Sequence, residues 1–154
     1  MSAPRPSFLK VYGERNTGTN YFTALLESNL STRILPGTVP RLIDRLALGA
    51  NRVQRRRGKL PEDRAKPGER IKDLWFAATF ARNLGWKHML VDAASMSEAH
   101  PRAQRTAFVT LTKNPYSWLL SLYRRPYHAA DRTGVEFAAF LGRPWPAVGR
   151  EHAE

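Results

Sequence analysis

The feature that most constrains the fold is a glycine-spaced loop between an apolar segment and a helical pattern. Residues 8–12 read FLKVY, a short apolar run of the kind that forms strands. Gly13 and Gly18 follow, with four residues between them. Apolar residues then recur at helical spacing, at Tyr21, Phe22, Leu25, Leu26 and Leu30. Residues 8–30 therefore predict a strand, a loop and a helix, with Thr17 or Thr19 as the helix N-cap.

The two glycines have the spacing of a phosphate-binding loop. In nucleoside triphosphatases the second glycine precedes a Lys for the phosphates and a Ser or Thr for magnesium. Thr19 and Asn20 stand there instead. Backbone N–H groups, Thr17 and the Arg15 guanidinium suit an anion that is bound without a metal. A plain strand-to-helix turn explains this loop, taken alone, equally well.

The rest of the chain alternates strand and helix patterns. Residues 85–92 are predicted to be a loop that enters a buried strand, and 107–112 a strand. Helices are predicted at 40–56, 70–84 and 135–141, and 113–125 is predicted as a strand end that leads into a helix. This order predicts one α/β domain over residues 1–154 with a mainly parallel central sheet. Ligands of such sheets bind beyond the carboxyl ends of the strands. Residues 13–20, 86–88 and 113–121 are predicted to lie there.

Positive charge dominates the composition and gathers in one region. The net charge is +12, from 25 basic and 13 acidic residues, which predicts an anionic partner. Eleven of the basic residues fall between 33 and 70, so we expect a basic helical and loop insertion at about 36–70, with 57–69 as an exposed loop. The run Arg55–Arg57 can bind nucleic acid, steer an anionic acceptor or simply be solvated. Interleaved aromatic residues for base stacking are missing there.

Several site classes are excluded or disfavoured by composition. The chain has no cysteine, which excludes a disulfide scaffold, a thiol nucleophile and a cysteine-ligated zinc site. The His, Asp and Glu spacings suggest no metal site. The sequence shows no signal peptide and no run of about 20 apolar residues. We therefore expect a cytoplasmic protein without a membrane span, with a weakly structured tail from about residue 146.

A second stretch, LTKNPYSWLLSLYRRPYH, begins at Leu111 and places Lys113 at a strand end, with Ser121 two helical turns further on. These side chains can hold a phosphate if the helix runs alongside it. Taken with this stretch, YGERNTGTNYF resembles the phosphosulfate loop of the sulfotransferases that use 3′-phosphoadenosine 5′-phosphosulfate. The later stretch resembles the segment of that family that holds the 3′-phosphate, and GWKH lies between the two. The resemblance covers roughly residues 8–145.

The resemblance implies a fold, a co-substrate and a set of binding residues. The fold would be a three-layer α/β/α arrangement like that of P-loop nucleoside triphosphatases. The co-substrate would be 3′-phosphoadenosine 5′-phosphosulfate, with no metal, and the acceptor a hydroxyl or amine of a small molecule or glycan. Its binding residues would be Arg15, Asn16, Thr17, Gly18, Thr19 and Asn20 at the phosphosulfate, and Lys113 and Ser121 at the 3′-phosphate. Lys113 stands where the family usually has Arg.

Catalysis in such a site needs a base and a cation. His88 resembles the histidine at the end of a central strand that takes the acceptor proton, and a surface Lys-His pair is the alternative. The family usually has a basic residue where Asn16 stands here, so Arg15, Lys87 or Lys10 must supply the positive charge near the leaving phosphate.

One further departure from the family shapes the remaining expectations. Family members usually continue well beyond the 3′-phosphate segment, and few residues follow Trp145 here. A minimal form, a fragment and a product with an altered C-terminus are the three explanations, and in each of them nucleotide binding can survive while turnover is weak or absent. The alternative function is a basic nucleic-acid-binding module without catalytic activity. Thr19 and Asn20 argue against a third function, that of a magnesium-dependent kinase or nucleoside triphosphatase.

Overall fold

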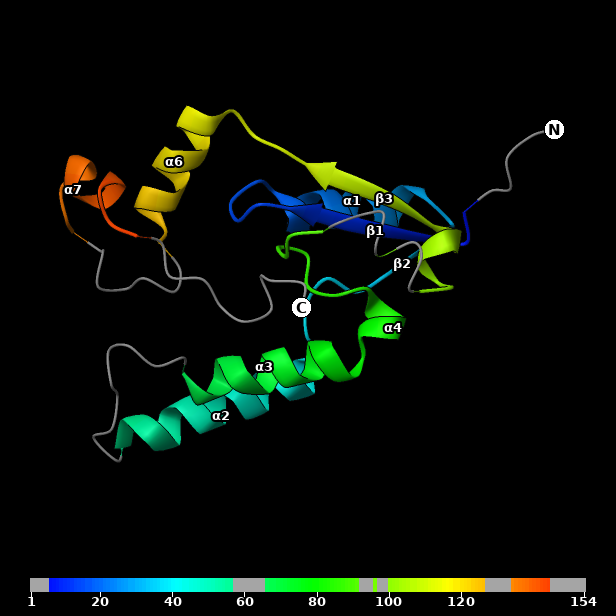
Figure 1. Cartoon of the computed structure of the whole chain (residues 1–154), viewed down its shortest axis with the longest axis horizontal. Coiled ribbons are helices and arrows are strands. Elements are labelled where there is room, and N and C mark those ends of the chain that lie inside the picture. The colour runs from blue at the N-terminus through cyan, green and yellow to red at the C-terminus, as the bar shows by residue number, and fades with distance from the viewer. Residues whose placement is uncertain (1–5, 57–65, 92–95, 97–99, 127–133, 145–154) are drawn as a thin grey trace.

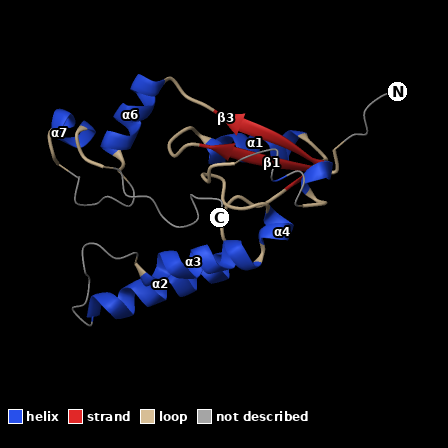
Figure 2. Cartoon of the chain, viewed as in Figure 1, coloured by secondary structure: helices blue, strands red, loops and turns tan. Residues whose placement is uncertain are grey.

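A parallel sheet forms the centre of the molecule. The computed structural model describes residues 6–56, 66–91, 96, 100–126 and 134–144. Strands β1 (Phe8–Gly13), β2 (Arg33–Ile34) and β3 (Thr106–Leu111) pair in the order β2-β1-β3, and both pairings are parallel (Figure 1 and Figure 2). The predicted α/β class with a parallel sheet is therefore confirmed.

Most predicted helices are present. They are α1 (Thr19–Asn29), α2 (Arg41–Arg56), α3 (Pro67–Ala78), α4 (Phe80–Asn83), α6 (Pro115–Arg124) and α7 (Phe137–Leu141), with a short 3₁₀ turn η1 (Ala103–Arg105) before β3. The helix predicted at 70–84 is divided at Thr79 and begins earlier, because Pro67 fits a first helical turn. The predicted loop at 57–69 is therefore wrong for its last three residues. No helix of the described chain is both long and apolar enough to cross a membrane.

Residues 85–91 form a loop, as predicted for the start of the 85–92 segment, but they enter no strand within the described residues, so the strand predicted there is wrong. Met89 and Val91 instead pack in the core cluster that contains Tyr12 of β1. Apolar residues of this segment therefore cover a face of the sheet and do not extend it. The third strand is β2, two residues long, which has no sequence pattern of its own. Residue 92, part of 57–69 and the tail from about 146 lie outside the described residues.

The two faces of the sheet are covered by different parts of the chain. Side chains alternate along β1, so Tyr12 and its paired-strand neighbour Phe108 lie on one face. That face carries the core cluster of Tyr12, Leu35, Leu84, Met89, Met96 and Ala103. Val11 points to the opposite face, where it lines a cavity together with residues of α1. Figure 1 shows α1 lying behind the strands.

Lys10 is fully buried in this core and serves the fold. Its Nζ atom donates to the carbonyl oxygens of Pro36 (2.7 Å), Asn83 (2.6 Å) and Gly85 (2.6 Å). Burial lowers its pKa from the ordinary 10.5 to about 7. Lys10 projects to the Tyr12 face and uses its three donors on backbone carbonyls. It is therefore not the cation of the glycine-spaced loop, which corrects one of the three expected sources of charge.

The basic region is a pair of helices. Figure 1 shows α2 and α3 running side by side. They are antiparallel, because Lys72 pairs with Asp44 (2.9 Å) and Gly68 lies beside Asn51. A Cβ added to Gly68 would lie 2.4 Å from the Ala47 carbonyl oxygen, so the two backbones approach closely. The Asn51 Oδ1 atom accepts from the Gly68 N–H (2.9 Å) and thereby satisfies a donor in the first turn of α3.

Helices α6 and α7 lie beyond the end of β3 (Figure 1). The Tyr123 hydroxyl donates to the Val135 carbonyl oxygen (2.8 Å). Its ring also contacts Phe137 and Phe140 edge-on, with centroid distances of 5.1 Å and 5.5 Å. This aromatic cluster holds the two helices together.

Candidate anion-binding site

The three sequence segments singled out above meet at the carboxyl edge of the sheet. Gly13, the last residue of β1, lies opposite Leu111, the last residue of β3. Its N–H group donates to the Lys87 carbonyl oxygen (2.9 Å), which brings residues 86–88 to the same place. Residues 113–121 follow β3 directly. The structure therefore gives these segments the arrangement that the parallel sheet predicted.

The loop after β1 begins a helix without a side-chain cap. Asn16 (φ 64°) and Gly18 (φ 88°) adopt left-handed backbone conformations, and Gly18 is the N-cap of α1. The predicted capping by Thr17 or Thr19 is wrong, because the Thr17 hydroxyl donates back to the Glu14 carbonyl oxygen (2.5 Å) and Thr19 is already helical. The first N–H groups of α1 therefore have no N-cap side chain to which they can donate a hydrogen bond.

An unpaired donor lies in the same loop. The Nδ2 atom of Asn16 is buried, and no described residue accepts a hydrogen bond from it. A buried amide donor without a partner costs free energy unless an acceptor reaches it. An oxygen of a bound anion is one such acceptor, so Asn16 fits the loop's predicted role.

Lys87 is the cation at the start of α1. Its Nζ atom donates to Oδ1 of Asn20, and its side chain is buried. Backbone hydrogen bonds fix it on both sides, from Gly13 N–H to its carbonyl oxygen (2.9 Å) and from its own N–H to the Gly37 carbonyl oxygen (3.2 Å). Burial lowers the Lys87 pKa below its ordinary 10.5. The structure thus unites two of the residues predicted for the site, Asn20 and Lys87.

A small cavity adjoins this pair. It has a volume of about 110 Å³ and lies between α1 and the sheet. Its lining includes Val11, Asn20, Thr23, Ala24, Glu27, Leu35, Gly37, Thr38 and Lys87. The polar end, at Asn20 and Lys87, is the part that lies next to the loop.

Arg15 anchors the loop. Its side chain is only 6% exposed, and its guanidinium carbon lies 4.9 Å from the centre of the Trp86 ring. Its carbonyl oxygen accepts a hydrogen bond from Nε1 of Trp118 in α6 (2.8 Å). The sequence analysis gave neither Trp86 nor Trp118 a role in the loop. The signal for Trp118 was its indole N–H, which needs an acceptor when it is buried.

His88 lies against the end of β1. Its Nδ1 atom is 2.5 Å from the Gly13 carbonyl oxygen, and its ring meets Trp86 edge-on with a centroid distance of 4.8 Å. A carbonyl oxygen can only accept, so Nδ1 carries the proton in this contact. Nε2 of a neutral ring is then the atom that can take a proton. His88 therefore lies at the carboxyl end of β1, in the tautomer that a base requires, and its role as a base stays a prediction.

Lys113 and Ser121 touch each other. Lys113 Nζ donates to Ser121 Oγ (2.7 Å), and that oxygen donates to the Ser117 carbonyl oxygen one turn earlier (2.7 Å). Asn114 caps α6, because its Oδ1 atom accepts from the N–H groups of Tyr116 (3.1 Å) and Ser117 (3.3 Å). Although they are eight residues apart in the sequence, Lys113 and Ser121 therefore form an exposed contact between two side chains that can both donate hydrogen bonds. Trp118 of the same helix links it to the loop through Arg15.

The site therefore combines a cation at an uncapped helix start, an oriented histidine and a lysine–serine pair on the adjacent helix. No group of three or more potential metal ligands occurs among the residues that the structure describes. Comparisons with protein-family models, curated proteins and solved structures find no match to this chain.

Proposed function

We propose that the chain binds 3′-phosphoadenosine 5′-phosphosulfate at this edge and transfers its sulfuryl group to a hydroxyl or amine acceptor. The observation that carries the proposal is the contact of Lys87 with Asn20 at the uncapped start of α1. It puts a buried positive charge beside backbone N–H groups that no N-cap side chain satisfies, a combination that suits a phosphate ester. The three-layer, P-loop-like fold and the cytoplasmic location expected from the sequence belong to the same proposal.

At the 5′ end, the loop from Arg15 to Asn20 would hold the phosphosulfate. The N–H groups at the start of α1 and the Asn16 amide offer donors, and Lys87 offers charge to the leaving phosphate. Lys87 takes this role in preference to Arg15, whose guanidinium packs on Trp86 and whose backbone ties the loop to α6.

At the 3′ end, Lys113 and Ser121 would bind the second phosphate. Their side chains already lie 2.7 Å apart, so one phosphate can bridge both donors. A lysine supplies a point charge and not the planar fork of an arginine, which makes this contact less selective for geometry.

His88 would accept the proton of the acceptor. The acceptor oxygen or nitrogen attacks sulfur, its proton passes to Nε2 of His88, and the bond from sulfur to the bridging phosphate oxygen breaks. The products are the sulfated acceptor and 3′,5′-adenosine bisphosphate. Lys87 stabilises the charge that develops on the departing phosphate.

Calorimetric titration with 3′,5′-adenosine bisphosphate, without magnesium, tests the donor site. Lys113→Ala, Ser121→Ala and Lys87→Met should each weaken binding by about tenfold or more, because each removes a donor to a phosphate. Ser28→Ala is a matched control, since Ser28 Oγ makes the same bond to a carbonyl one turn earlier (2.9 Å) on an exposed helix. Lys66→Ala controls for the loss of one positive charge.

The same titration separates the competing functions. ATP with magnesium should bind no better than ATP alone. Equal loss of affinity in the control variants, or no bisphosphate binding at all, would overturn the proposal. Salt-sensitive binding of a short RNA in place of the bisphosphate would favour the nucleic-acid-binding alternative.

A further inference from the structure

Helix α2 presents two parallel rows of side chains. Its arginine row comprises Arg41, Arg45, Arg52 and Arg56, at successive spacings of four, seven and four residues. Its apolar row comprises Leu42, Leu46 and Val53, at spacings of four and seven. Both spacings return to the same side of a helix with 3.6 residues per turn. The apolar row repeats the arginine row one residue later, so the rows lie on neighbouring stripes.

The apolar row does not face α3. Leu42, Leu46 and Val53 are 68%, 54% and 50% exposed. The contact with α3 is made by other positions of α2, including the buried Ala47 and the capping residue Asn51. Three large apolar side chains in one exposed line beside charged residues are typical of a surface that binds a partner.

The arginine row is not neutralised within the described structure. Asp44 is the one acidic residue in the α2 sequence, and its carboxylate pairs with Lys72 of α3 (2.9 Å). The ion pairs found among the described residues of this region join Lys72 to Asp44 and to Glu69. The arginines of α2 therefore keep their full charge for an external anion.

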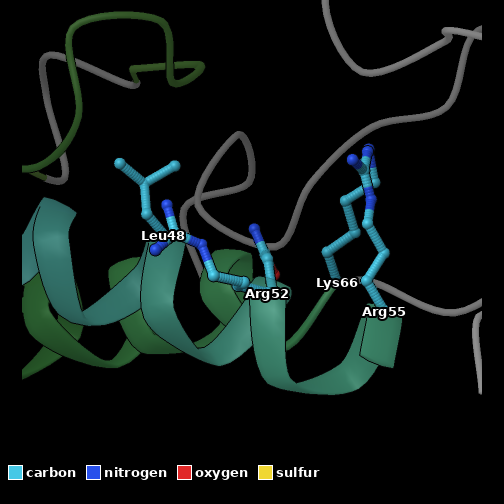
Figure 3. Close-up of a pocket in the computed structure, with 5 residues that line it drawn as sticks. Leu48, Arg52, Arg55 and Lys66 are labelled. Atoms are coloured by element: carbon cyan, nitrogen blue, oxygen red, sulfur yellow. The ribbon is translucent and has the colours of Figure 1, made fainter. Parts of the chain in front are cut away.

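A hollow at the end of the row gathers further charge. It has a volume of about 310 Å³ and is lined by Leu48, Asn51, Arg52, Arg55 and Lys66, from the end of α2 and the residue before α3. Figure 3 shows Arg52, Arg55 and Lys66 projecting to the same side of the ribbon, next to Leu48. Among the residues that the structure describes, three cationic side chains and no acidic one line this hollow, which suits a phosphate group.

We propose that α2 docks on the surface of an anionic lipid bilayer. The helix would lie in the plane of the membrane, with the apolar row at the boundary of headgroups and acyl chains and the arginine row on lipid phosphates. Each basic residue near such a surface adds to the electrostatic attraction. This inference is independent of the donor site.

A lipid surface accounts for both rows, whereas a nucleic acid accounts for one. RNA or DNA would contact the arginines and leave Leu42, Leu46 and Val53 in water. The α2 sequence also has no aromatic side chain on which a base could stack. The apolar row is therefore the observation that favours the bilayer.

Vesicle flotation tests the docking. The full chain should bind phosphatidylcholine vesicles that contain about a third phosphatidylserine, and bind pure phosphatidylcholine at least about tenfold more weakly. Arg45→Gln/Arg52→Gln should lower anionic-vesicle binding about tenfold or more, and Leu42→Ser/Leu46→Ser should lower it by a similar factor even at low salt. The matched control is Leu25→Ser/Arg33→Gln, which changes an exposed leucine of α1 and an exposed arginine of β2.

A spectroscopic probe measures insertion directly. The chain has no cysteine, so Leu46→Cys provides one attachment point for an environment-sensitive fluorophore, and Ala81→Cys on the exposed side of α4 is the control. Anionic vesicles should shift the emission of the label at position 46 to the blue and leave the label at 81 unchanged. All variants are compared after circular dichroism shows the same helix content.

Three outcomes would overturn the proposal. The first is absence of binding to anionic vesicles. The second is vesicle binding that the arginine variant loses and the leucine variant keeps, because charge alone then explains it. The third is RNA binding that depends on the same arginines while the label at position 46 shows no blue shift, which would assign the face to nucleic acid.

Discussion

The molecule contains two strand–loop–helix units, β1 with α1 and β3 with α6, and both strands end at the same edge of the sheet. The helices of the two units begin in different ways. Helix α6 starts at Pro115 after a cap from the side chain of Asn114, two features that its own sequence supplies. Helix α1 starts after Gly18, a left-handed residue that provides no side-chain cap. The second unit therefore caps its helix with a side chain of its own sequence, whereas the first has no such cap.

The contacts that hold the two units differ in range. Lys113 and Ser121 are eight residues apart in the chain, and their contact needs little more than a formed helix. Lys10 reaches carbonyls 26, 73 and 75 residues away, and Lys87 reaches Asn20 across 67 residues. The difference teaches that the first loop is shaped by the whole fold. A site there is lost when the fold loosens, whereas the α6 pair survives.

The largest expected effect is a pH dependence of the free energy of unfolding that comes from Lys10 of the first unit. The pKa of Lys10 falls from 10.5 to about 7 on folding, so between these values the unfolded chain binds more protons than the folded one. The free energy of unfolding should therefore rise with pH from about 7 to 10, by up to about 1.4 kcal/mol per pH unit. Lys87, whose pKa is also lowered, adds to the rise with the same sign.

Urea unfolding at pH 7, 8, 9 and 10 measures this dependence. The Lys10→Met variant should show a smaller slope, because the remaining rise comes from Lys87. A wild-type stability that stays flat over this range would mean that the three carbonyl oxygens keep Lys10 charged despite its burial.

The next effect concerns the turn after β1. A Cβ at Gly13 would lie 2.8 Å from the Leu111 carbonyl oxygen and 2.8 Å from Thr17 Oγ1, so Gly13→Ala should cost about 2 kcal/mol in the free energy of unfolding. Gly49→Ala is the control, since no atom lies within 4 Å of its added Cβ on α2. That change should stabilise the chain by about 0.5–1 kcal/mol. Thermal unfolding compares the two, and equal midpoints would contradict the close packing of Gly13.

A third change removes the hydrogen bond that joins Trp118 of α6 to Arg15 in the loop after β1. Trp118→Phe removes the indole N–H that donates to the Arg15 carbonyl oxygen, and should cost about 1.5 kcal/mol because that carbonyl loses its donor. Bisphosphate affinity should fall as well, since the loop is then less firmly placed. Trp75→Phe, which alters a half-buried ring beside Phe76, is the control for loss of ring area. A Trp118→Phe protein with unchanged affinity would show that the loop holds its shape without α6.

The smallest effect is confined to the second unit. Asn114→Ala removes the cap of α6 and should cost about 1 kcal/mol, whereas Asn114→Ser, which can still cap, should cost less. Urea unfolding measures both variants. A loss of several kcal/mol would show that the second unit also depends on distant contacts, and the contrast between the units would then disappear.

The secondary structure was largely predictable, with one instructive failure. Periodicity located β1, β3, α1, α2 and α6, because each shows its own strand or helix pattern within a few residues. Residues 85–92 were predicted as a loop that enters a buried strand, but Met89 is buried, and Val91 partly buried, by packing on the face of the sheet. A short apolar run indicates that its residues are buried. It does not tell whether they are buried as a strand within the sheet or as a loop packed on its face. The two-residue strand β2 has no pattern to read.

The candidate site was also predictable only in part. Sequence spacing was enough to select Lys113 and Ser121, since an eight-residue interval spans about two turns of any helix. It also placed residues 13–20, 86–88 and 113–121 at one edge, because parallel strands end together. It did not distinguish the roles of Lys10, Arg15 and Lys87. The structure buries Lys10 among carbonyls, stacks Arg15 on Trp86 and brings Lys87 to Asn20.

The sequence by itself thus determined the local elements, the excess of positive charge and the edge where polar residues gather. Only the tertiary structure decided which cation faces the start of α1 and which face of α2 stays exposed. The physical reason is range. A helix or a cap is stabilised by neighbours within a few residues, so its pattern can be recognised in a short stretch of sequence. A buried lysine is positioned by carbonyl and amide oxygens that lie far away in the chain, and they meet it only after the sheet has formed.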